Sequence, residues 1–388
     1  MKILMVVKYP PIQGGVSASC YWLAQALAEL GHRVTVLTNA NEVEGDYRIN
    51  LNEEDCSLLT GFRIKKSVRV VSTSKDVRHH FTPYANPYMS KIVSLGLDLI
   101  AQEKPDLIWA HYVEPYGIAA LMLSKLTGIP YVIKHAGSDL GKLGRTPQME
   151  TLHQEVYRHA LIVSTMPKHH PYFESIGVSP EKLMKCGFKH LPGDLFYPTP
   201  QNEPSEITKI LIYGKTGPNK GTPQLIGALK LLKDEVCVTA YWGGKNLPQT
   251  LKQVSEAEIA TELDVRGFIP HWRIPDCIRE ADAVLFLENN FPISFHGPGI
   301  PLEVLSCGRI LITTEEIANK MPHLISEKNS IILEGVELTP EKIANGIRMV
   351  PKTLSREHAE DNLDASLVYA QGMQNLEEFI RVVRAQMA

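Results

Sequence analysis

Two lysines in one glycine-rich segment are the first residues of the sequence that suggest a chemistry. Lys215 and Lys220 lie in residues 214–221, between a β-branched run and an amphipathic run. Such a loop between a strand and a helix can hold a diphosphate, because lysine charge and the unpaired N–H groups of a helix start both attract anions. The segment is not a P-loop, since that motif needs a glycine where Lys209 stands. The pattern therefore predicts phosphate binding, and a pair of ordinary surface lysines is the alternative.

Glu303 follows a second loop rich in glycine and proline. The loop contains Gly297, Gly299 and Pro301, and an apolar run and the β-branched run 310–314 come after it. This order predicts a loop, a short helix and a buried strand. Glycine lets the backbone approach a ligand closely, and the helix start favours an anion. Glu303 lies in the first turn of this helix. Its carboxylate either accepts hydrogen bonds from sugar hydroxyls or only complements the helix dipole. A helix start that favours an anion, together with a carboxylate that accepts from hydroxyls, suits a ligand that carries both phosphate and hydroxyls.

Patterns in the rest of the chain predict alternating strands and helices, which would hold these loops in place. Short β-branched runs predict strands at residues 2–7, 34–37, 107–110, 131–135, 161–165, 209–213, 236–241, 265–268, 283–287, 310–314 and 331–333. Amphipathic runs predict helices at residues 16–30, 89–103, 117–126, 222–232, 340–349 and 366–385. The repeated βαβ pattern is typical of α/β, doubly wound sheets, which bind ligands at the carboxyl ends of their strands.

Glycine or polar residues follow three strands of the first half. Gly14 and Gly15 follow the first strand, but the segment is not GxGxxG and does not support a dinucleotide site. His135 begins the segment His-Ala-Gly-Ser-Asp, which ends at Asp139 and combines turn residues with binding groups. We therefore favour a functional role for His135. For His111, which ends another strand, a satisfied cap is the better interpretation.

Length and composition restrict the class of protein. A chain of 388 residues is too long for one ordinary core, and the proline-rich residues 191–206 are the best linker between two domains. With 44% hydrophobic and 21% charged residues the chain is globular, and its net charge of -3 gives no general case for nucleic acid binding. The six cysteines lack CxxC spacing and indicate neither a zinc site nor a disulfide framework. Without a signal-peptide pattern or about 18 consecutive apolar residues, a cytoplasmic protein is expected.

The least periodic part of the first half, residues 42–88, carries two basic clusters. Their members are Arg63, Lys65, Lys66, Arg69, Lys75, Arg78, His79 and His80. Such charge could contact an acidic acceptor or, peripherally, a membrane surface. A solvated face is the simpler interpretation.

Five short motifs, in their order and spacing, resemble those of glycosyltransferases with the GT-B fold. They are GGV at 14–16, PDLIWAH at 105–111, HAGSD at 135–139, GKTGPNKG at 214–221 and GIPLEVLSCG at 299–308. The chain is most similar to the retaining family 4, or group 1, of these enzymes. The resemblance implies two Rossmann-like doubly wound domains facing across a cleft: an acceptor-binding domain at 1–195 and a nucleotide-sugar-binding domain at 205–369. It also implies that a C-terminal helix, about 370–388, crosses back to the first domain.

The resemblance further implies roles for individual residues. His135, Lys220 and Glu303 match the catalytic positions that contact the transferred sugar, the leaving diphosphate and the donor hydroxyls. The implied donor contacts come from Gly14, Gly15, Lys215, Lys220, Phe268, Ile269, His296, Gly299, Ile300 and Glu303. His111 and Asp139 are candidates for contacts with the acceptor.

The chain departs from the family at two of these positions. The family pattern E-x7-E requires a first glutamate where Phe295 stands, and phenylalanine cannot accept a hydrogen bond from a hydroxyl. Glu288 or His296 could take over that role. Lys215 stands where the family usually has arginine, so the charge is kept but the bidentate fork is lost.

The function that the resemblance implies is transfer of a sugar from a nucleotide diphosphate sugar, with retention of anomeric configuration. The acceptor is unknown and could be a glycan, a lipid-linked molecule or a small molecule. No cofactor and no metal is expected, because lysines supply the charge that stabilises the leaving diphosphate. The alternatives are a GT-B nucleotide-sugar epimerase or phosphorylase, or a catalytically silent subunit that binds nucleotide sugars.

Overall fold

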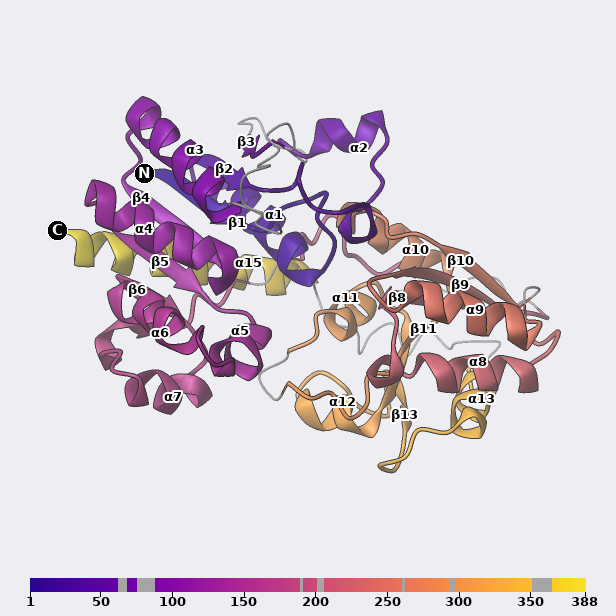
Figure 1. The fold of residues 1–388 in the computed structure, drawn as a ribbon. Coiled ribbons are helices and arrows are strands. Elements are labelled where there is room, and N and C mark those ends of the chain that lie inside the picture. The colour runs from indigo at the N-terminus through magenta and orange to yellow at the C-terminus, as the bar shows by residue number, and fades with distance from the viewer. Residues whose placement is uncertain are drawn as a thin grey trace. The chain divides into compact units, whose positions relative to one another are not determined.

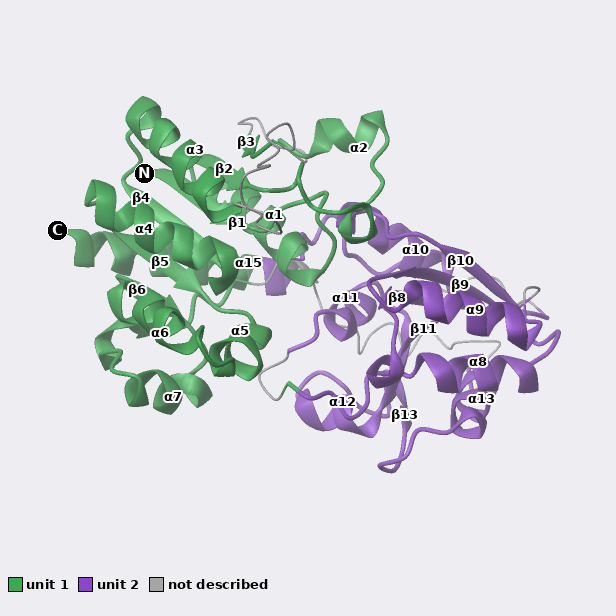
Figure 2. Ribbon diagram, in the orientation of Figure 1, with its two compact units in different colours: residues 1–190, 293–296, 370–388 green, residues 191–292, 297–369 purple. Residues whose placement is uncertain are grey.

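The computed structural model describes residues 1–61, 68–74, 88–188, 191–200, 206–259, 262–293, 297–350 and 365–388 (Figure 1). The chain divides into two compact units. The first contains residues 1–190, 293–296 and 370–388, and the second contains 191–292 and 297–369 (Figure 2). Each unit is built on one parallel sheet with helices, which confirms the predicted α/β class with two doubly wound domains. Apart from Arg69, the predicted basic clusters lie outside the described residues.

The first unit has a seven-stranded parallel sheet. Its strands are β1 (Lys2–Val7), β2 (Arg33–Thr38), β3 (Arg69–Ser72), β4 (Leu107–His111), β5 (Tyr131–Lys134), β6 (Ile162–Ser164) and β7 (Leu183–Met184). Their order is β3-β2-β1-β4-β5-β6-β7, so the direction in which the sheet is wound reverses between β1 and β4. The sequence patterns predicted five of these strands and missed the short edge strands β3 and β7.

The helices of the first unit cover both faces of its sheet. They are α1 (Gly15–Glu29), α2 (Glu53–Leu58), α3 (Tyr88–Glu103), α4 (Ile118–Thr127), α5 (Gly137–Gly141), α6 (Glu150–His159), α7 (His170–Ser175) and, from residue 370 onward, α15 (Ala365–Met387). Short 3-10 turns and one π turn connect them: η1 (Gly45–Tyr47), η2 (Val113–Gly117), η3 (Leu143–Arg145), η4 (Pro167–His169) and η5 (Pro180–Lys182). None of the described helices is both long and apolar enough to cross a membrane.

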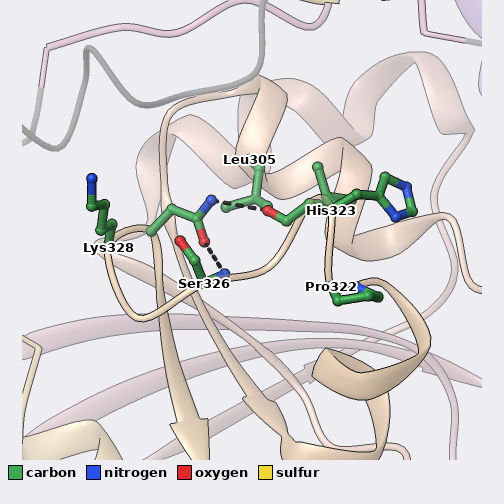
Figure 3. Close-up of a pocket in the computed structure, with 7 residues that line it drawn as sticks. Leu305, Pro322, His323, Ser326 and Lys328 are labelled. Carbon is green, nitrogen blue, oxygen red and sulfur yellow. Dashed lines mark hydrogen bonds between the residues drawn. The ribbon is translucent and has the colours of Figure 1, made fainter.

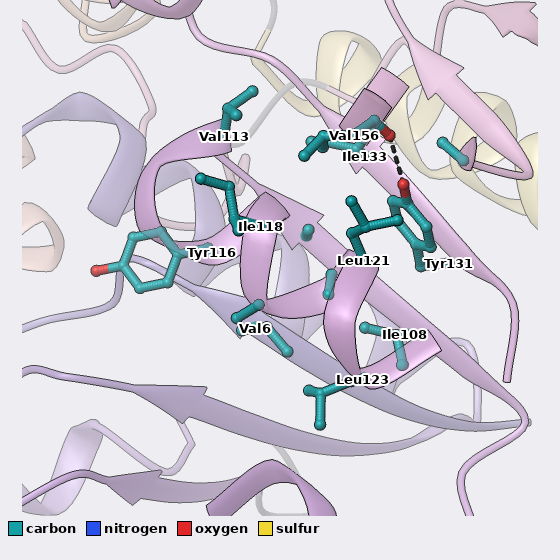
Figure 4. Packing of buried hydrophobic residues seen from close by; sticks show 14 of the residues in the cluster. Val6, Ile108, Val113, Tyr116, Ile118, Leu121, Leu123, Tyr131, Ile133 and Val156 are labelled. Atoms are coloured by element: carbon teal, nitrogen blue, oxygen red, sulfur yellow. Dashed lines mark hydrogen bonds between the residues drawn. The ribbon is translucent and has the colours of Figure 1, made fainter. Parts of the chain in front are cut away.

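Successive side chains of β4 pack against helices on opposite faces of the sheet. Ile108 belongs to the buried cluster that α4 covers, together with Leu121 and Leu123 (Figure 4). Successive side chains of a strand point to opposite faces, so Trp109 faces the other side. There its ring lies 5.3 Å from the ring of Phe379 in α15, between centroids, which fixes the C-terminal helix against the first unit.

The second unit has a six-stranded parallel sheet. Its strands are β8 (Thr208–Lys215), β9 (Val236–Gly243), β10 (Leu263–Arg266), β11 (Ala283–Phe286), β12 (Ile310–Thr314) and β13 (Ser330–Leu333). Their order is β10-β9-β8-β11-β12-β13, so the winding reverses between β8 and β11. The helices and turns are η6 (Pro218–Lys220), α8 (Thr222–Leu231), α9 (Leu247–Ala257), η7 (His271–Arg273), α10 (Ile274–Glu280), α11 (Ile300–Ser306), α12 (Glu315–Lys320) and α13 (Pro340–Arg348). All six strands were predicted, although β10 ends before Phe268.

Buried Arg309 anchors the segment that enters the second unit. Its guanidinium donates hydrogen bonds to the backbone oxygens of Ala281 at 2.9 Å and Thr199 at 3.1 Å. Arginine has no acceptor atom and is costly to bury unless its N–H groups find acceptors. Residues 191–200, which the sequence indicated as the start of a linker, are therefore held against the second unit.

Candidate active site

The predicted lysine loop of the second unit lies where the strand order of the sheet reverses. Lys215 ends β8, Lys220 lies in η6 just beyond it, and Glu288 follows the neighbouring strand β11 by two residues. In open α/β sheets the carboxyl ends of strands at such a reversal are the usual place for a ligand. The fold therefore gives the two predicted lysines a position suited to binding.

Glycine is required at two points of this loop. Gly217 has φ 148°, and its N–H donates to Thr222 Oγ1 at 3.0 Å. Gly221 has φ 66°, and a Cβ there would lie 2.6 Å from Cβ of Leu287. Both positions favour glycine, by backbone conformation and in the second case also by lack of space. The loop is consequently pressed against the end of β11.

Lys220 is already engaged by the protein. Its ammonium group donates to a carboxylate oxygen of Glu288, whose side chain is 0% exposed, and lies 4.2 Å from the ring centroid of Phe291. A buried carboxylate is strongly disfavoured unless a cation compensates it. Because the Glu288 side chain has no exposed surface, it is poorly placed to accept a hydroxyl of a ligand in place of the glutamate missing at Phe295. Phe295 and His296 themselves lie outside the described residues.

Glu303 is held in place by two side chains that the sequence analysis did not single out. Tyr213 Oη, on β8, donates to Glu303 Oε2 at 2.7 Å, and His271 Nε2, on η7, lies 2.9 Å from Glu303 Oε1. Burial and the charge of Glu303 raise the pKa of Tyr213 well above its usual value, so the phenol remains a hydrogen-bond donor. Glu303, which is 5% exposed, thus bridges β8, η7 and the first turn of α11.

Other predicted donor residues lie on these same elements. Ile300, at the start of α11, lies against Gly214, because a Cβ at Gly214 would be 3.9 Å from Ile300 Cδ1. Gly299 precedes it as the helix cap. Phe268 and Ile269 are half-buried and lie in the segment between β10 and η7. The structure therefore places them beside the turn that carries His271, while their predicted contact with the donor stays a prediction.

In the first unit, Gly14 and Gly15 open α1 directly after the loop that follows β1. Gly14 has φ 111°, a conformation that favours glycine, and a Cβ there would lie 3.5 Å from Lys8 Nζ. This loop is at the point where the first sheet reverses its winding. Its position agrees with a ligand-binding loop, although its role in donor binding stays a prediction.

His111, a candidate for acceptor contacts, is a core residue. It is buried, and its Nδ1 lies 3.2 Å from Sγ of Cys20 in α1. Burial raises the pKa of the Cys20 thiol to about 12, so it remains protonated at neutral pH. The interpretation as a satisfied strand-end histidine agrees with this geometry, and we do not retain His111 among the proposed acceptor contacts.

His135 follows β5 and is a neutral, half-buried side chain. Its Nε2 lies 2.8 Å from Oγ1 of Thr165, and its ring packs against His169 and Phe173 with centroids 5.5 and 5.4 Å away. Burial lowers the pKa of His135 to about 4, which keeps the imidazole uncharged at neutral pH. A neutral imidazole can exchange hydrogen bonds with a sugar without presenting a fixed charge.

Asp139 joins two loops at the carboxyl ends of neighbouring strands. Its Oδ2 accepts hydrogen bonds from the backbone N–H groups of Ala136 at 2.8 Å and Val113 at 3.3 Å. The side chain is buried, and burial raises its pKa from 3.8 to about 6. This geometry favours a structural role over the predicted contact with an acceptor.

A cavity elsewhere in the second unit does not coincide with the predicted site. Its volume is about 270 Å³, and it is lined by Leu305, Pro322, His323, Leu324, Ser326, Lys328 and Asn329 (Figure 3). Most of these residues lie between α12 and β13, and Asn329 braces the loop by hydrogen bonds with Leu324 and Ser326.

In the part of the chain that the structure describes, no three His, Cys, Asp or Glu side chains are grouped so that they could hold a metal ion.

Two family models match the chain in succession. The Glycosyl transferase 4-like domain matches residues 14–183, and Glycosyl transferases group 1 matches residues 196–360. No curated protein matches the sequence significantly. The chain belongs to the group 1 glycosyltransferases of the GT-B fold.

Solved structures with low sequence identity share the fold over nearly the whole chain. Sucrose-phosphate synthase from Thermosynechococcus elongatus aligns with a TM-score of 0.61 and 16% identity, covering 99% of this chain and 96% of that chain. HepE from Anabaena, in complex with UDP and glucose, aligns with a TM-score of 0.67 and 14% identity, covering 99% and 100%. UDP-N-acetylglucosamine 2-epimerase from Rickettsia bellii aligns with a TM-score of 0.58 and 13% identity, covering 100% and 97%. At such identities the likeness shows the fold alone.

The ion pair of Lys220 yields a prediction about stability. In Lys220→Met the buried Glu288 carboxylate loses its cation, and we expect the free energy of unfolding to fall by about 3 kcal/mol. The double variant Lys220→Met/Glu288→Leu should recover most of that loss, because it removes both charges. Urea denaturation measures the free energy of unfolding of the single and the double variant. The control Lys252→Met, whose partner Glu256 is exposed, should change stability by less than about 1 kcal/mol. A single Lys220 variant as stable as the wild type would contradict this account.

Asp139 yields a prediction about pH. Its pKa is higher in the folded chain, about 6, than the ordinary 3.8, so it contributes stability at low pH that is lost as the pH rises through 6. In Asp139→Asn this loss is absent, and Asn can still accept both backbone hydrogen bonds. The stability of Asp139→Asn relative to the wild type should therefore rise by roughly 3 kcal/mol between about pH 4 and pH 7.

Urea denaturation at several pH values measures this difference. Asp98→Asn, at an exposed position of α3, is the control, and its difference from the wild type should stay nearly constant. A constant difference for Asp139→Asn as well would rule out the buried carboxylate as the source of the pH dependence.

Proposed function

We propose that the chain transfers a glycosyl group from a nucleotide diphosphate sugar to an acceptor with retention of anomeric configuration. The observation that carries this proposal is the lysine loop at the reversal point of the second sheet, next to the bridging carboxylate Glu303. Membership of the group 1 glycosyltransferases supports the type of reaction. The related fold of HepE, solved with UDP and glucose and with UDP-glucose, favours a uridine diphosphate sugar as the first donor to test.

The chemistry follows from where charge develops. As the bond between the sugar and the diphosphate breaks, negative charge grows on the departing phosphate oxygens. Lys215 and the backbone N–H groups of the loop stabilise this charge more strongly in the transition state than in the ground state, which is what accelerates the reaction. Lysine ammonium groups can supply this stabilisation, so the proposed reaction does not require a metal.

Glu303 orients the donor in this proposal. Its carboxylate accepts hydrogen bonds from donor hydroxyls, and Tyr213 and His271 keep its two oxygens in fixed positions. A side chain fixed before the ligand arrives loses less entropy on binding. His135 of the first unit is proposed to contact the transferred sugar as a neutral imidazole.

The engagement of Glu288 and Glu303 argues against the nucleophilic mechanism of retaining glycosidases. A retaining glycosidase employs one carboxylate as nucleophile and a second as acid and base. In the second unit, Glu288 is engaged with Lys220 and Glu303 is engaged with Tyr213 and His271. We therefore propose a reaction without a protein nucleophile, in which a phosphate oxygen of the donor helps to deprotonate the acceptor hydroxyl.

Glu303→Gln tests the proposed orienting role. Loss of the charge should lower the rate of UDP release from the best nucleotide sugar by roughly a hundredfold, as expected when a group that positions the reacting sugar is lost. The control Glu256→Gln, on the exposed face of α9, should retain the wild-type rate. Equal rates in Glu303→Gln and the wild type would remove Glu303 from the site.

Product analysis by NMR in the same assay identifies the reaction. A glycoside of the donor's anomeric configuration agrees with the proposal, and the opposite anomer contradicts retention. A nucleotide sugar with one inverted sugar carbon would instead identify an epimerase, and a sugar 1-phosphate would identify a phosphorylase. A wild type that binds nucleotide sugars without converting them would identify a silent binding subunit.

A further inference from the structure

Three lysines gather around the loop after β8, and among the residues that the structure describes only one of the three finds a carboxylate partner. Lys220 is paired with Glu288. Lys215 and Lys245 form no ion pair with any residue that the structure describes. Lys245 follows β9 by two residues and was not singled out from the sequence, because it belongs to no motif.

Direct packing brings the loop that carries Lys245 against the loop that carries Lys215. In the β8–β9 ladder, Lys215 is the register partner of Gly243. A Cβ at Gly244 would lie 3.3 Å from Cγ of Lys215, so the lysine stem runs over this glycine. On the other side of Lys245, the amide of Asn246 donates to the backbone oxygen of Thr216 at 3.1 Å. Lys245 is therefore flanked on both sides by contacts with the lysine loop.

The two ammonium groups influence each other electrostatically. Lys215 remains exposed, yet partial burial of its ammonium group and the positive charges of Lys220 and Lys245 lower its pKa. Like charges held close together repel, and an anion bound between them relieves that repulsion. The charges of Lys215 and Lys245 lie at the carboxyl ends of β8 and β9, next to the point where ligands bind to such sheets.

We propose that Lys245 binds the donor diphosphate together with Lys215, beside the part of the loop that the pair of Lys220 with Glu288 holds in place. This inference rests on the proposed function, because it names the charges that the donor meets. The diphosphate of a nucleotide sugar carries two negative charges, and Lys215 and Lys245 supply two positive ones. The neutral pair of Lys220 and Glu288 adds no net charge to this balance.

Calorimetry with UDP and with inorganic pyrophosphate tests the proposal. Lys245→Ala should bind both ligands about tenfold more weakly than the wild type, and the dependence of affinity on salt concentration should become less steep. Lys245→Arg, which keeps the charge, should restore most of the affinity. Lys252→Ala, on the neighbouring helix α9, is the matched control and should bind like the wild type.

The outcomes separate this inference from the function on which it rests. If the wild type binds UDP and Lys245→Ala binds it equally well, the role of Lys245 is wrong and the proposed function stands. Weakening that Lys245→Arg does not restore would also contradict the proposal, because charge would not be the cause. If the wild type binds neither UDP, GDP, ADP nor pyrophosphate, both the inference and the proposed function fail.

Discussion

The arrangement of the candidate site depends on the contact between the loop after β8 and the segment after β11. The ion pair of Lys220 with buried Glu288 belongs to this contact, and a carboxylate without exposed surface requires such a cation. Backbone bonds reinforce it: the N–H of Asn289 donates to the oxygen of Asn219 at 3.1 Å, and the Asn219 amide donates to the oxygen of Asn290 at 2.7 Å. The two elements on either side of the strand reversal are thus joined before any ligand binds.

This constraint separates the charges of the site into two kinds. Lys220 and Glu288 neutralise each other and fix the loop, whereas Lys215 and Lys245, the proposed ligands of the diphosphate, form no ion pair with any residue that the structure describes. Glu303 is fixed in a similar way, by Tyr213 and His271. Phosphates and hydroxyls would therefore meet groups whose positions the protein has already set, and such preorganisation is the main way in which enzymes stabilise developing charge.

Much of the fold could be predicted from the sequence, because buried parallel strands are read from short β-branched runs. The edge strands β3 and β7 and the helix α12 were not predicted, because each is brief. Helix α9 was also missed, although Leu247, Leu251 and Val254 recur at helical spacing. The positions of Lys215 and Glu303 were also predicted from local patterns. Their structural partners could not be: Lys220 and Glu288 are 68 residues apart and Tyr213 and Glu303 are 90 apart, so only the folded sheet brings them together. Likewise, no local pattern indicates that Lys245 lies beside Lys215 or that His111 is buried against Cys20.

The most direct test of this account is a crystal structure of the chain with a bound nucleoside diphosphate. We expect the diphosphate at the carboxyl ends of β8 and β11, within hydrogen-bond distance of Lys215 Nζ, with a ligand hydroxyl on the carboxylate of Glu303 and the pair of Lys220 with Glu288 intact. A nucleotide bound elsewhere, for example in the cavity lined by His323 and Lys328, with Lys215 and Glu303 free of ligand, would contradict it.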